Sequence, residues 1–192
     1  PAAAARQQAI QWVQGVPGEP LDRRAVAVGT MPDGLPSFVC VAAYKGGLHP
    51  GMTGVWIDGC SIGHGGREVT VKAYDVMVGS GSWTRAEGGN VPADAMAVGN
   101  EANGPALYVC RAQYQGGMFA GKTRPGFNGC NIGDQGEEKT VRTYEVLVSA
   151  PAAPAQPRSG ATPSLYDNSG SWAVESWTEG ANAHMCSATI AN

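Results

Sequence analysis

The chain has 192 residues, a formal net charge of −3, 28 glycines and only 15% charged residues. The negative charge argues against a binder of nucleic acid or anionic membranes, because either partner requires a basic face. No apolar run approaches the roughly 18 residues of a membrane helix, and the glycine content is typical of a turn-rich β protein with one or two small cores.

The chain opens on the low-complexity stretch PAAAA, and residues 1–9 are predicted to be a leader or a spacer. Small residues of this kind occur beside signal-peptide cleavage sites. An ordinary spacer fits the same letters, so both interpretations stay open.

Two copies of one unit follow, offset by 70 residues. The matching segments are AVAVG (25–29) with AMAVG (95–99), FVCVAAYKGG (38–47) with YVCRAQYQGG (108–117), GCSIG (59–63) with GCNIG (129–133), and EVTVKAYDVMV (68–78) with EKTVRTYEVLV (138–148). A repeated unit predicts one structural element used twice. The two predicted repeats span residues 10–79 and 80–149.

Each repeat shows the two-residue alternation of β-strands. The face that is similar in both copies carries Tyr108, Cys110, Ala112 and Tyr114, matched by Phe38, Cys40, Ala42 and Tyr44. Side chains alternate between the two faces of a strand, so this shared face is predicted to be core and the opposite face, with Val41 or Arg111, more exposed. The sequence therefore predicts an all-β fold, with two tandem repeats of small antiparallel sheets related by a pseudo-two-fold axis.

Residues 116–123, GGMFAGKT, match the phosphate-binding pattern G-x-x-x-x-G-K-[ST] letter for letter. That loop must lead directly into a helix, whose N-terminus holds the phosphates. Here Pro125 and two glycines follow within six residues, and the first repeat has GGLHPGMT at the same place. The segment is predicted to be a turn between strands, and no nucleotide site is expected.

Four of the five cysteines recur in the repeats, as Cys40 with Cys60 and Cys110 with Cys130, each pair 20 residues apart. One disulfide per repeat would stabilise the fold by roughly 3 kcal/mol in an oxidising compartment, whereas free buried thiols would pack as small apolar groups. Cys186 is unmatched. The histidines, at 49, 64 and 184, have no metal-ligand spacing, so neither a metal nor a cofactor is predicted.

After residue 149 the composition changes. Residues 150–164 are a Pro/Ala-rich linker, and residues 165–192 alternate as a short β-hairpin-like segment. This C-terminal segment is either the start of a further domain or a strand pair that packs on the repeats.

The repeated motifs resemble the DM-nine repeat family. The resemblance is carried by Gly99–Thr123, by GCNIG at 129–133 and by YEVLV at 144–148, with their partners in the first repeat. It implies an all-β lectin that binds mannose or mannose-rich glycans and forms homodimers, and no catalysis is expected. The cysteine pairs favour a secreted or extracytoplasmic location, and the charge and hydropathy favour neither a nucleic-acid nor a membrane partner.

The resemblance also implies the sugar-binding residues, a lysine and an acidic turn residue. They map onto Lys122 in the second repeat and Asp33 in the first; the second repeat has Asn103 at the acidic position, with Glu101 two residues earlier, and the first has Met52 at the lysine position. A carboxylate and an ammonium suit the hydroxyls of a hexose, and Phe119, Trp56 or Phe127 could stack on its apolar face. Glu68 and Glu138 are predicted to bond turn amides.

Two functions are carried forward. The first is carbohydrate binding without catalysis, and the alternative is a structural or protein-interaction module of a secreted or surface protein. A glycosidase is disfavoured because Glu137 and Glu138 are adjacent and would point to opposite faces of a strand.

Overall fold

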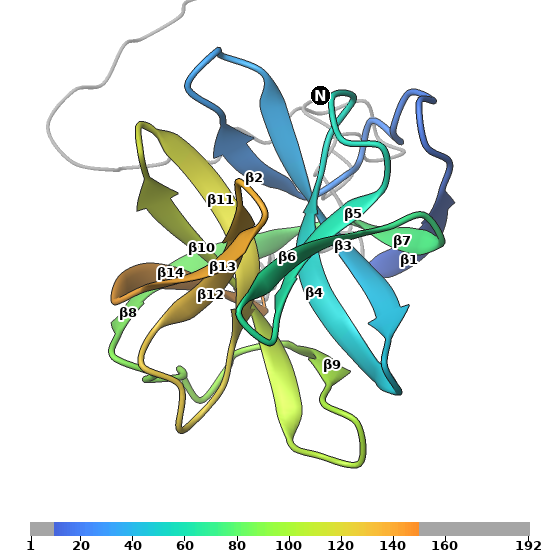
Figure 1. Cartoon of the computed structure of the whole chain (residues 1–192). Coiled ribbons are helices and arrows are strands. Elements are labelled where there is room, and N and C mark those ends of the chain that lie inside the picture. Colours follow the sequence, from blue (N-terminus) through green and yellow to red (C-terminus); the bar gives the residue numbers. More distant parts are fainter. Residues whose placement is uncertain (1–9, 150–192) are drawn as a thin grey trace, which may run out of the picture. The chain divides into compact units, whose positions relative to one another are not determined.

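The computed structural model describes residues 10–149 and shows an all-β fold, which confirms the predicted class (Figure 1). The first repeat contributes β1 (Gln11–Gly15), β2 (Ala27–Thr30), β3 (Pro36–Tyr44), β4 (Gly47–Thr53), β5 (Cys60–His64), β6 (Arg67–Val71) and β7 (Tyr74–Val78). The second contributes β8 (Gly81–Glu87), β9 (Ala97–Asn100), β10 (Ala106–Tyr114), β11 (Gly117–Thr123), β12 (Cys130–Asp134), β13 (Glu137–Val141) and β14 (Thr143–Ser149).

All these strands belong to one sheet, whose order displays the internal symmetry. The order is β1-β7-β3-β4-β5-β6-β13-β12-β11-β10-β14-β8, with β2 beside β3 and β9 beside both β10 and β4. Each strand of the first half corresponds to the strand numbered seven higher in the second half, in mirrored order. The two repeats are therefore related by a pseudo-two-fold axis at the β6–β13 junction.

Two glutamates form hydrogen bonds across this junction. Glu68 accepts a hydrogen bond from the backbone N–H of Gly136 and Glu138 accepts one from Gly66, both at 2.9 Å. Gly66 and Gly136 have φ of 81° and 82°, a left-handed conformation that favours glycine. The two glutamates thus bond turn amides, as predicted, but each does so in the other repeat.

A disulfide in each repeat joins strands that are not neighbours. Cys40 of β3 bonds Cys60 of β5, with β4 between them, and Cys110 of β10 bonds Cys130 of β12 across β11. Strands two apart in a flat sheet are separated by about 9.6 Å, yet the Cα atoms of Cys40 and Cys60 are 5.9 Å apart. The sheet must therefore bend sharply at β4 and at β11.

The prediction that one face of β3 and β10 is core and the other is more exposed is wrong for much of the second face. Val41, predicted to be more exposed, is only 3% exposed. Val39 on the same side of β3, and Leu107 and Val109 on the matching side of β10, are completely buried. Val39 and Val109 belong to a hydrophobic cluster that contains residues of both repeats. That side of each strand is buried because the repeats pack on one another, which the sequence of one repeat cannot show.

Arg111, on the same face of β10 as Val109, is partly buried and makes contacts with both repeats. Its side chain donates to Glu145 at 2.7 Å and to the carbonyl of Val28 at 2.8 Å, and it stacks 4.4 Å from the Trp83 ring. Val28 lies in the first repeat, so Arg111 helps to join the repeats. It also lines a shallow cavity of about 410 Å³ with Arg85 and Met118.

Residues 10–149 contain no helix long and apolar enough to cross a membrane. The predicted leader, the Pro/Ala-rich linker, the C-terminal segment and Cys186 lie outside the described residues.

Candidate functional site

The lysine of the GGMFAGKT motif lies in a strand. Residues 117–123 form β11, which pairs with β10 and β12, and the turn that follows leads to β12 rather than to a helix. This geometry cannot cradle a phosphate in the manner of a nucleotide-binding loop. Lys122 is instead 2% exposed, which is unusual for a lysine in the interior of a sheet.

The Lys122 ammonium lies between two partners. Its Nζ is 3.2 Å from Nδ1 of His49 and 3.7 Å from Oε1 of Glu101, too long for a direct hydrogen bond to the carboxylate. Burial lowers the pKa of Lys122, and the nearby Glu101 opposes that shift. An ammonium has three N–H donors. Within residues 10–149, His49 accepts a hydrogen bond from one of those of Lys122.

His49 is oriented so that it can accept from Lys122. Its Nε2 lies 3.2 Å from the carbonyl oxygen of Tyr44. A carbonyl can only accept, so Nε2 carries the proton and Nδ1 presents its lone pair to Lys122. Burial and the neighbouring Lys122 lower the pKa of His49, which keeps the ring neutral. Gly47 makes room for this ring, because a Cβ there would lie 2.7 Å from Nε2.

Glu101 reaches the site through pairing between the repeats. Strand β9 of the second repeat pairs with β4 of the first, with Asn100 opposite Leu48. The next residue, Glu101, therefore lies beside the strand that carries His49. Its side chain is 25% exposed, whereas the side chain of Lys122 is only 3% exposed.

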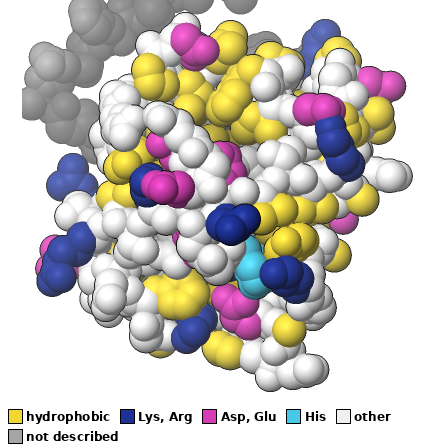
Figure 2. Space-filling view, in the orientation of Figure 1, with side chains coloured by type: hydrophobic (Ala, Val, Ile, Leu, Met, Phe, Trp, Pro, Cys, Tyr) yellow, Lys and Arg dark blue, Asp and Glu magenta, His cyan; other side chains and the backbone are white. Residues whose placement is uncertain are grey.

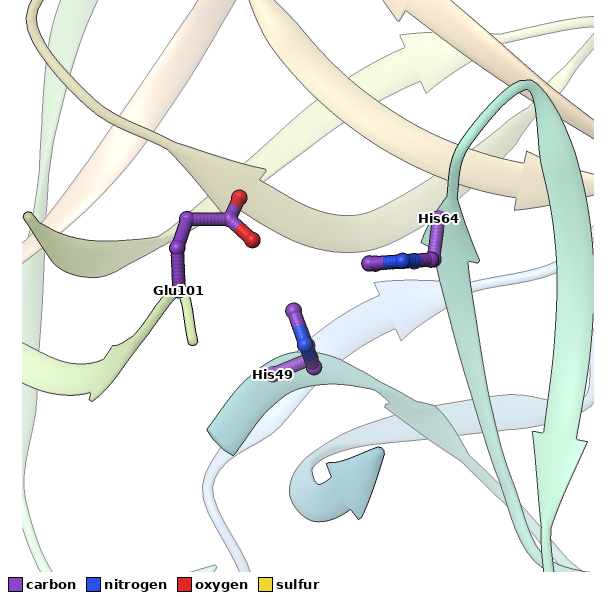
Figure 3. A group of neighbouring side chains, drawn as sticks. All are labelled: His49, His64 and Glu101. Atoms are coloured by element: carbon purple, nitrogen blue, oxygen red, sulfur yellow. The ribbon is translucent and has the colours of Figure 1, made fainter. Parts of the chain in front are cut away.

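His64 completes the cluster, and its position beside His49 was not predicted from the sequence. The ring centroids of His49 and His64 are 4.9 Å apart, with an interplanar angle of 74°. The ring of His64 also packs edge-to-face with that of Tyr44, at 5.3 Å between centroids. Figure 3 shows both imidazoles and the Glu101 carboxylate pointing toward one another. Sequence spacing predicted no histidine cluster, but the adjacent strands β4 and β5 bring these two together; the third histidine lies outside the described residues. We call Tyr44, His49, His64, Glu101 and Lys122 the Lys122 cluster.

The cluster reaches the molecular surface. In Figure 2 a patch of histidine surface lies between basic and acidic side chains. His49 is 1% exposed and His64 is partly exposed, so most of this surface belongs to His64. A ligand approaching from solvent would meet His64 and Glu101 first and Lys122 last.

The structure separates the predicted sugar-binding residues into two groups. Lys122 and Glu101 come together, as described. Asp33 is exposed and accepts from the backbone N–H of Leu35 in its own turn, which packs on Gly117 of the second repeat. Asn103 is exposed with φ of 51°, a left-handed turn position that asparagine tolerates.

The pseudo-two-fold axis relates the Lys122 cluster to a second set of residues, offset by 70. We call these residues the Met52 cluster: Met31, Met52, Tyr114, Phe119 and Asp134. Met52 and Phe119 are buried in the main hydrophobic core, and Met31 and Tyr114 pack against it. Of the three aromatic candidates for sugar stacking, Phe119 is thus buried here against Tyr114, Phe127 is covered by Arg124, and Trp56 is 39% exposed.

The fold and the site together define an all-β, tandem-repeat module with one polar cluster built from both repeats. The DM9 repeat profile matches residues 3–71 and 31–141. These matches span more than half of the chain, and the chain therefore belongs to the DM9 (DM-nine) repeat family.

Comparison with other proteins supports the fold and goes no further. No curated protein matches the sequence significantly. The crystal structure of the nematode sperm cell motility protein MFP2B is similar, with a TM-score of 0.55 and 16% identity over 80% of this chain. The match covers 50% of the MFP2B chain, so this chain spans about half the length of that neighbour.

Proposed function

We propose that this protein binds carbohydrate of the mannose type without catalysis, and that the Lys122 cluster is its binding site. One observation carries the proposal. Three positions that are apolar in the Met52 cluster are polar in the Lys122 cluster: Met31 corresponds to Glu101, Phe119 to His49 and Met52 to Lys122. These changes fall in both repeats, yet they meet in one place.

A stable fold has no need of polar side chains at these three positions, because the equivalent positions hold Met31, Phe119 and Met52, which lie in the hydrophobic core or pack against it. A buried ion pair is weak evidence for stability, since apolar residues of similar volume often serve as well or better. The polar residues are therefore best explained by a ligand.

The geometry suits a sugar hydroxyl. A hydroxyl both donates and accepts, so one placed between the two groups accepts from the Lys122 ammonium and donates to Glu101. The 3.7 Å separation leaves these two groups without a direct hydrogen bond to each other. His49 holds the ammonium in position, and adjacent hydroxyls of a hexose can use both carboxylate oxygens of Glu101.

Two disulfides fit the proposed secreted or extracytoplasmic location, because they persist in oxidising compartments. A homodimer fits the exposed edge strand β1, on which Trp12 and Val13 remain 39% and 36% exposed. The same exposed apolar residues favour the alternative function, a protein-interaction module.

Glycan-array binding of the wild type and of Lys122→Met tests the proposal. Methionine already occupies the equivalent buried position in the first repeat, so the variant is expected to fold. A charge-assisted hydrogen bond contributes about 1.5–3 kcal/mol, so we expect mannose-type binding to weaken by at least about tenfold. Lys72→Met, at an exposed lysine paired with Asp58, is the matched control and should bind as the wild type does.

Selective mannose binding that survives Lys122→Met would place the site elsewhere. Absence of glycan binding by a folded wild type would refute the carbohydrate proposal and favour the protein-interaction module.

A further inference from the structure

The Lys122 cluster also contains a set of metal-ligand side chains, which shares His49 and Glu101 with the carbohydrate proposal and adds His64. His49, His64 and Glu101 each offer one ligand atom, and these atoms all lie within 4.8 Å of one another. Two imidazoles and one carboxylate are ligands of zinc and related ions, in sites that keep an open position for water or another ligand. We propose that His49, His64 and Glu101 form a binding site for a divalent transition-metal ion, with Zn²⁺ as the best-suited ion.

The surroundings of His49 match those of a metal ligand. A ligating imidazole commonly donates its other N–H to a carbonyl or carboxylate, which fixes the tautomer. Nε2 of His49 lies 3.2 Å from the carbonyl oxygen of Tyr44, so Nδ1 carries the lone pair and points into the cluster.

The other two ligands come from separate elements and are partly exposed. His64 ends β5, and Glu101 follows β9 of the other repeat, so the ion would join the repeats (Figure 3). Because both side chains reach solvent, an ion can enter without unfolding the core. The Met52 cluster has Met31 and Phe119 at the positions of Glu101 and His49, and it cannot supply this ligand set.

Lys122 is a competitor for the metal. Its ammonium lies 3.2 Å from Nδ1 of His49 and 3.7 Å from Glu101, and so occupies the place of the cation. Metal binding must move this ammonium away from His49. Replacing Lys122 with methionine removes the competing charge and should strengthen metal binding.

Calorimetric titration of the full chain with zinc chloride tests the proposal. We expect one Zn²⁺ per chain, binding at least about tenfold weaker in His64→Ala and in Glu101→Gln, and binding several-fold tighter in Lys122→Met. The control is His184→Ala, which removes the histidine beyond the described residues and should leave the affinity unchanged.

Three results would overturn the proposal: no zinc binding by the wild type, equal binding by the wild type and His64→Ala, or binding abolished by His184→Ala. The first of these results includes the case in which only Lys122→Met binds zinc, since the native lysine would then exclude the ion. The test involves no sugar, and glycan binding measured with a chelator present separates this proposal from the carbohydrate proposal.

Discussion

The Lys122 cluster and the Met52 cluster are related by the pseudo-two-fold axis, but three positions differ in polarity. The first holds Glu101, His49 and Lys122 where the second holds Met31, Phe119 and Met52. The strand order around them is equivalent, with β4 and β11 in matching positions of the sheet, although β9 also pairs with β4 whereas β2 pairs only with β3. Each cluster takes residues from both repeats, so neither belongs to one copy. The pseudo-two-fold assembly thus creates two equivalent locations between the repeats. The side chains present at each location decide whether it is a polar site or part of the core.

Transplanting the lysine should produce the largest effect. Met52→Lys places a charge among Met31 and Phe119, where a buried unpaired charge destabilises by about 3–5 kcal/mol. Adding Met31→Glu supplies the carboxylate that Glu101 provides in the other cluster and should recover about 1 kcal/mol. Urea unfolding of the single and double variants measures both effects. A single variant as stable as the wild type would mean that the two clusters do not differ in polarity as described.

The disulfides should act equally in the two repeats. Both close loops with a sequence separation of 20, so the chain-entropy account gives about 3 kcal/mol for each. Cys40→Ala/Cys60→Ala and Cys110→Ala/Cys130→Ala should lose similar free energies of unfolding in denaturant titrations. A difference between them above about 1 kcal/mol would show that the symmetry does not extend to their energetics.

The glutamates at the pseudo-two-fold junction should show a smaller, matched effect. Glu68→Ala and Glu138→Ala each remove a bond to a turn amide of the other repeat, at a loss of about 1–2 kcal/mol. Glu137→Ala, at the exposed neighbour that pairs with Lys139, should leave the unfolding temperature close to that of the wild type, because surface ion pairs contribute little to stability. Thermal unfolding of the three variants distinguishes a lock between repeats from general surface charge.

The smallest effect is expected at Asp134, the counterpart of His64. Burial, with a smaller contribution from Glu68, raises the pKa of Asp134, and its Oδ2 has no hydrogen-bond partner within residues 10–149. A raised folded-state pKa destabilises the fold above that pKa, and the penalty disappears as the pH falls through it. Asp134→Asn should therefore stabilise by no more than about 0.5 kcal/mol at pH 7, with the gain vanishing toward about pH 4. A gain that grows on acidification would contradict the assigned cause.

Much of the architecture was predictable because the sequence repeats itself. The matching segments predicted two equivalent β units, and the resemblance to the DM-nine family singled out Lys122 and, near the acidic turn position, Glu101. The pairing of β9 with β4 was not predictable, since it joins Asn100 to Leu48 of the other repeat. The burial of Val109 and Val39 was not predictable for the same reason, since it depends on packing between the repeats.

The histidines were missed because sequence spacing does not report on pairing between strands. His49 and His64 meet only when β4 and β5 lie side by side. A signal was nevertheless present, because the repeats differ at Met31/Glu101, Phe119/His49 and Met52/Lys122. Comparing the copies position by position, rather than searching for what they share, would have identified the polar cluster.

The central claim is that only the Lys122 cluster binds a sugar, and NMR titration tests it most directly. Backbone amide shifts of the ¹⁵N-labelled protein would be followed as a mannose disaccharide is added. The account predicts perturbed amides around His49, His64, Glu101 and Lys122, with those around Met31, Met52 and Phe119 unchanged. Perturbations centred on the Met52 cluster, or equal in the two clusters, would contradict it.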